Sequence, residues 1–91
     1  MYYNVHNLRE GGREGNWLAY WEEATGIKST ICHHVGCNQW ATDGAHVQLD
    51  DPNDKRWFIV PLCHKCNCQF GEHFIVSGPL VSVSDPKIIL W

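Results

Sequence analysis

Apolar side chains recur with helical spacing between residues 16 and 26. They fall at positions i, i+3, i+4 and i+7, on one face of a helix: Trp17, Tyr20, Trp21 and Ala24. Asn16 stands where an N-cap residue is expected, and Gly26 stands where helices commonly end in a left-handed residue. The pattern predicts a helix whose aromatic face packs into the core, with a partner-binding face as the competing interpretation.

Elsewhere, apolar and polar positions alternate in short runs, which is typical of strands. Short strands are predicted over 27–31, 45–49 and 57–60, and short strands or extended packing segments over 81–83 and 88–91. Residues 50–56 are rich in Asp, Asn and Pro, so they predict the turn of a hairpin. A short helix is predicted over 65–70. Residues 1–15, which include a Gly-rich charged run at 9–15, are predicted to be a flexible N-terminal segment.

Length and charge narrow the class of protein. A chain of 91 residues predicts a single small domain over 1–91, with a core that gives only marginal stability unless a metal ion or another cross-link adds to it. Seven Lys and Arg against ten Asp and Glu give a formal charge of −3, which disfavours nonspecific coating of nucleic acid. No run is apolar enough to span a bilayer, and the first residues lack the pattern of a signal peptide. We therefore expect an intracellular, cytoplasmic protein with no membrane partner.

The cysteines carry the clearest chemical signal. There are five, an odd number, and without an export signal this count argues against a disulfide framework. Four of them form two close pairs, Cys32-x4-Cys37 and Cys63-x2-Cys66, with 25 residues between the pairs. Zinc prefers four ligands in a tetrahedron, and two tight turns can supply two thiolates each. The spacing predicts a structural Zn²⁺ that staples the small fold.

The ligand set has alternatives within the same segments. Cys68 would replace Cys66 with a spacing equal to that of the first pair. A histidine, His33, His34 or His64, would replace a cysteine. The competing interpretation is a group of buried thiols that hold no metal.

A longer series of residues carries a family resemblance. Cys32-x4-Cys37 is followed by Gly44-Ala45-His46-Val47, and then by Ile59-Val60-Pro61-Leu62-Cys63-x2-Cys66-Asn67. This series resembles the zinc-containing branch of the HNH (ββα-metal, treble-clef) endonuclease family. The resemblance implies an α+β fold: a small zinc-stabilised treble-clef domain with its zinc knuckles and ββα core over 32–68. The N-terminal helix and the short C-terminal strands predicted above would flank this core.

The resemblance also implies an activity and two catalytic residues. In that family, a histidine at the end of the first hairpin strand is the general base, and a helix residue helps to hold a catalytic divalent ion. His46 would be the base, and Asn67 would be the helix-borne ligand of Mg²⁺ or Mn²⁺. The implied function is metal-assisted hydrolysis of a phosphodiester in nucleic acid.

Two departures from the family pattern favour a different function. Ala45 stands where the family often has Asp or Glu, and Phe58 stands where it has Asn. The alternative hypothesis is a degenerate, inactive member that binds a protein partner, as a small inhibitor or adaptor. Five tryptophans supply candidate anchors for such an interface. A third hypothesis is binding of nucleic acid without cleavage, through Lys55, Arg56 and Lys65, with Lys28 as a further candidate.

Overall fold

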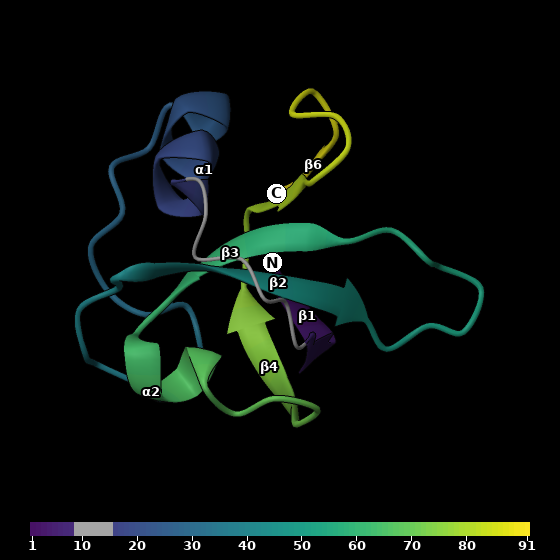
Figure 1. The fold of residues 1–91 in the computed structure, drawn as a ribbon, viewed down its shortest axis with the longest axis horizontal. Helices are drawn as coiled ribbons and strands as arrows, with labels where there is room; N and C mark the ends of the chain where they lie inside the picture. Colours follow the sequence, from purple (N-terminus) through teal and green to yellow (C-terminus); the bar gives the residue numbers. More distant parts are fainter. Residues whose placement is uncertain (9–15) are drawn as a thin grey trace.

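The computed structural model describes residues 1–8 and 16–91, and the Gly-rich run at 9–15 lies outside the described residues. Two helices and six strands follow one another as β1 (Tyr2–Asn7), α1 (Trp17–Thr25), β2 (Asp43–Leu49), β3 (Phe58–Leu62), α2 (His64–Asn67), β4 (His73–Ser77), β5 (Leu80–Ser82) and β6 (Ile89–Leu90). Figure 1 shows α1 on one side of the strands and α2 on the other.

All six strands join one antiparallel sheet in the order β4-β1-β2-β3-β5-β6. The sheet curls into half a barrel (Figure 1). The strand β1 lies between β2 and β4, so the first residues of the chain occupy the interior of the sheet. Such long-range pairings depend on the register between distant segments rather than on local sequence.

The α+β treble-clef layout with an N-terminal helix is wrong for this chain. Strands and isolated bridges account for 37% of the described residues and helices for 15%, so the domain is mainly an antiparallel sheet. The predicted helix is present as α1, but it follows strand β1 and is not the N-terminal element of the fold. The hairpin of β2 and β3 followed by the short α2 is present, but it is built into the larger sheet instead of standing as an independent ββα core.

Two local predictions also fail. Residues 2–7 are not part of a flexible segment, because both edges of β1 are paired with neighbouring strands. Residues 27–30 form no strand, and Ile31 makes only an isolated bridge with Trp40. The alternation over 27–31 instead leads into the loop that carries the first cysteine pair.

The helix α1 lies where the sequence predicts it. The Asn16 side chain accepts a hydrogen bond from the Ala19 backbone, and Gly26 ends the helix with a left-handed φ of 71°. Trp21 is fully buried against Ile59 and Val81. The prediction that its aromatic face packs into the core is confirmed.

Close contact between α1 and β2 depends on a glycine. A Cβ on Gly44 would lie 2.5 Å from the backbone N of Leu18, nearer than real Cβ atoms approach.

The sheet has two apolar layers. The smaller one lies under α1, and the larger one lies on the opposite face, with Val47, Phe58 and three cysteines.

Candidate metal centre

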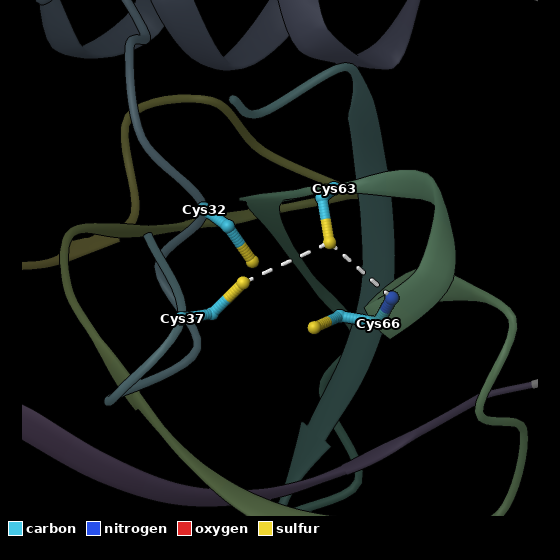
Figure 2. A group of neighbouring side chains, drawn as sticks. All are labelled: Cys32, Cys37, Cys63 and Cys66. Atoms are coloured by element: carbon cyan, nitrogen blue, oxygen red, sulfur yellow. Dashed lines mark hydrogen bonds between the residues drawn. The ribbon is translucent and has the colours of Figure 1, made fainter. Parts of the chain in front are cut away.

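Four cysteine side chains converge in the larger core. Cys32, Cys37, Cys63 and Cys66 place their sulfur atoms within 4.8 Å of one another. Figure 2 shows all four sulfurs pointing into the same small space. Three of the four residues are buried and Cys37 is half-buried. These are the four residues that the spacing predicts, and together they could hold a metal ion.

The arrangement fits the dimensions of a zinc site. In a tetrahedron with Zn–S bonds near 2.3 Å, neighbouring sulfurs lie about 3.8 Å apart. The Cys37 and Cys63 sulfurs are 3.9 Å apart. The Cys66 backbone N–H also points to the Cys63 sulfur, at 3.5 Å, as the turn of α2 brings the second pair together (Figure 2).

The first cysteine pair lies in a loop that closes the curled sheet. We call residues 31–40 the knuckle loop; it is closed on itself by the Ile31–Trp40 bridge. The backbone N–H of His33 donates to Pro61 O on β3, and its carbonyl accepts from Ser77 N on β4, both at 2.9 Å. Two strands separate β3 from β4 within the sheet, so the loop connects the two sides of the half-barrel.

One histidine lies beside the thiols without replacing any of them. His34 Nδ1 is 3.2 Å from the Cys66 sulfur, and its ring stacks on Phe74 at 4.6 Å. An N–H donor at this distance stabilises a thiolate and fixes the ring, the usual role of a residue surrounding a metal centre. The alternative that His34 is itself a ligand is not needed, since four sulfurs are in place.

The other alternative ligands lie outside the cluster. Cys68 is exposed, and its sulfur is 3.4 Å from His64 Nε2. His64 turns its Nδ1 toward Asp43, at 2.9 Å. The ring of His33 packs edge-on against Trp21 and bonds Ser77 O at 2.8 Å.

Burial and hydrogen bonds together set the pKa values of the thiols. Burial raises the pKa of Cys66, and hydrogen bonds with Cys63 and Cys32 raise it further. Burial likewise raises the pKa of Cys32. Burial also opposes ionisation of Cys63, but hydrogen bonds from the Cys66 backbone and from neighbouring thiols outweigh it and lower its pKa. The thiols therefore differ in how readily each becomes the thiolate that a metal ion requires.

Zinc affinity is expected to fall as the pH falls. Cys32 and Cys66 hold their protons at neutral pH, since burial raises their pKa values, and both protons must leave when a metal binds. Between about pH 7.5 and about pH 6, we expect the Kd for zinc to rise roughly a hundredfold or more per pH unit, since at least two protons leave. Competition with a chromophoric chelator measures this dependence. A Kd that stays constant over this range would contradict thiolate ligation.

The two predicted catalytic residues are not brought together. His46 is only 6% exposed and lies between the Trp17 and Trp57 rings, at 5.0 and 6.1 Å, on the face covered by α1. Asn67 bonds Asp43 Oδ2 at 2.9 Å and accepts, through its carbonyl, the side chain of Asn7. Asp43 and His46 are three residues apart on one strand, so their side chains point to opposite faces of the sheet.

Asp43 is the centre of a polar network that the sequence did not single out. Its carboxylate meets His64 and Asn67 of α2. Burial would raise its pKa, but the hydrogen bonds from Asn67 and His64 outweigh burial and lower it. This network fastens α2 to the start of β2. In the sequence, the one signal for this network is an acidic residue, Asp43, three positions before His46.

The fold and the site define a small antiparallel β-sheet domain with four cysteines that could bind a metal ion. No protein-family model, curated protein or solved structure matches the chain. Within the two described ranges, neither helix is long or apolar enough to cross a membrane.

Proposed function

We propose that this protein is a zinc-stabilised interaction domain that binds a protein partner. The convergence of Cys32, Cys37, Cys63 and Cys66 carries the zinc part of this proposal. Four sulfur ligands fill a tetrahedral site and leave no open position for water or substrate, so the ion's role is structural. It fastens the knuckle loop to the turn between β3 and α2.

The knuckle loop offers an apolar surface to a partner. Trp40 is 72% exposed and faces Ile31, which is 48% exposed, across the bridge that closes the loop. Exposed tryptophans of this kind are frequent interface anchors. The first cysteine pair lies between these two residues in sequence, so a bound ion would hold the Ile31–Trp40 pair in one shape. Such preorganisation reduces the entropy that binding costs.

The geometry gives less support to the nuclease function. A general base must reach the proton that it accepts, and His46 lies under Trp17 and Trp57. The basic residues near the hairpin are also partly engaged, since Arg56 makes a two-point contact with Asp54 at 3.0 and 2.7 Å. Nucleic acid as substrate or ligand thus remains a prediction from the resemblance.

Truncation of Trp40 is expected to disrupt the interface. Tagged, zinc-loaded protein purified from its native cells should retain a partner near one-to-one stoichiometry. The Trp40→Ala variant should bind that partner about 30-fold more weakly, the effect of losing a typical anchor residue. Calorimetry with the purified partner measures the Kd.

Trp91→Ala is the matched control, because Trp91 is also exposed, at 58%, but lies at the chain end outside the knuckle loop. It should bind the partner as the wild type does. Equal losses in both variants would contradict an anchor at Trp40. Nicking of supercoiled plasmid in Mn²⁺ that is abolished by His46→Ala would overturn the proposal in favour of the nuclease.

A further inference from the structure

Three side chains with metal-binding atoms meet on the face of the sheet that carries α1. His6 on β1 pairs with His73 on β4 and with Gln48 on β2. Cross-strand partners share a face of a sheet, as do residues two apart on a strand. Gln48 therefore shares its face with His46, which contacts α1, and with Asp50 just beyond the end of β2. The cysteine cluster lies on the opposite face.

The distances suit ligands of one ion. His6 Nδ1 is 2.8 Å and His73 Nδ1 is 3.0 Å from the same oxygen, Asp50 Oδ1. Metal-binding atoms of all three residues lie within 4.8 Å of one another. Adjacent ligands at right angles around an ion with bonds of about 2.1 Å lie about 3.0 Å apart. Both histidine–carboxylate separations already match that spacing.

The hydrogen bonds of the Gln48 side chain fix the His6 ring so that Nδ1 faces the Asp50 carboxylate. The Gln48 amide nitrogen donates to Lys55 O at 3.0 Å, which directs its Oε1 toward His6 Nε2, at 3.1 Å. His6 Nε2 must therefore carry the proton and donate it. Since Nε2 donates to Gln48, Nδ1 is the nitrogen of His6 that a metal ion beside the Asp50 carboxylate would bind, in place of a proton. Such partners commonly orient metal-binding histidines.

The surroundings favour a cation and leave room for further ligands. The three residues line an open hollow of about 500 Å³, whose walls also include Asp51, Asp54 and Lys55. Water or a small anion can fill the remaining coordination positions.

We propose that His6, Asp50 and His73 form a second metal site that binds a divalent transition-metal ion. Two imidazoles and one carboxylate suit Zn²⁺, Co²⁺, Ni²⁺ or Fe²⁺ better than Mg²⁺ or Ca²⁺, which prefer oxygen ligands alone. Three protein ligands from one side leave the ion open to solvent, unlike the closed set of four sulfurs. This inference does not depend on the proposed partner-binding function.

Cobalt added to the zinc-loaded, tag-free full chain tests the site. We expect one Co²⁺ to bind per chain beyond the zinc, measured by calorimetry, with weak visible absorption. An intense sulfur-to-cobalt band with no additional bound Co²⁺ would mean that cobalt enters only the cysteines, which would contradict the proposal. Asp50→Asn and His73→Gln should each weaken Co²⁺ binding by about tenfold or more, and Gln48→Met should weaken it by about tenfold through loss of the ring's partner.

Asp51→Asn is the matched control, because it removes a negative charge from the same hollow without removing a ligand. Its Co²⁺ affinity should stay within about twofold of the wild type, since a charge outside the ligand set contributes little. Circular dichroism establishes that each variant is folded. No binding of Co²⁺ at millimolar concentration, or equal weakening in Asp51→Asn and Asp50→Asn, would overturn the proposal.

Discussion

Replacement of Cys66 by serine is expected to abolish tight zinc binding and to unfold most of the chain. Cys66 is buried in the larger core beside Cys32 and Cys63. Structural zinc contributes roughly 10–16 kcal/mol in small zinc-finger peptides, which exceeds or equals the total stability of most domains. A chain of this size has no surplus of apolar burial to offset that loss. Metal analysis and thermal unfolding followed by circular dichroism measure both effects.

Cys68→Ser is the matched control for this experiment. Cys68 is two residues away on the chain, but it is exposed and contacts His64 instead of the cluster. The control should bind one zinc and melt within a few degrees of the wild type, as surface substitutions usually do. Equal behaviour of the two serine variants, or a melting curve that a chelator leaves unchanged, would rule out the zinc site.

Truncation of Trp21 should have the second large effect. Trp21 is fully buried on the face of α1 that packs on the sheet, and its indole N–H donates to Pro79 O at 2.8 Å. The Trp21→Ala substitution removes this packing and leaves a buried carbonyl without its donor, so we expect a loss of about 3–5 kcal/mol. Urea unfolding of the zinc-loaded protein measures the change in the free energy of unfolding.

Two further variants separate packing from hydrogen bonding at this position. Trp21→Phe keeps most of the apolar surface and loses the donor, so it should cost about 1–3 kcal/mol. Trp91→Ala, at an exposed position, should cost less than about 0.5 kcal/mol. If Trp21→Ala were as mild as Trp91→Ala, the packing of α1 on the sheet would be wrong.

The parts of the fold that local sequence predicted are those made by local contacts. Both ends of α1 carry their own signals, Asn16 and Gly26, and its apolar face repeats every turn. The hairpin of β2 and β3 needs only two alternating runs and a polar turn between them. These elements were predicted because a few neighbouring residues suffice to define them.

The larger sheet could not be predicted in the same way. The strand β1 is stabilised by β2 and β4, which lie far along the chain. Its own residues, from Tyr2 to Asn7, alternate too weakly to predict a buried strand. The resemblance to a treble-clef domain described the hairpin and its following helix, but the strands added around them changed the class of the fold.

The candidate sites also differ in whether local or long-range contacts form them. The spacing of Cys32, Cys37, Cys63 and Cys66 predicted that two tight turns present these sulfurs in pairs, and the structure selected Cys66 over the alternative Cys68. His46 was found as a motif residue, but its burial under Trp17 and Trp57 was decided by the docking of α1. No local signal linked His6, Asp50 and His73.

The sequence alone therefore predicted the two cysteine pairs, the caps of α1 and the central hairpin, all of which depend on residues close along the chain. The tertiary structure decided the six-stranded sheet, the burial of His46 and the grouping of His6 with His73. The physical reason is that strand register is a long-range property. A shift of one residue in the pairing of β1 would turn His6 to the other face and separate it from both partners.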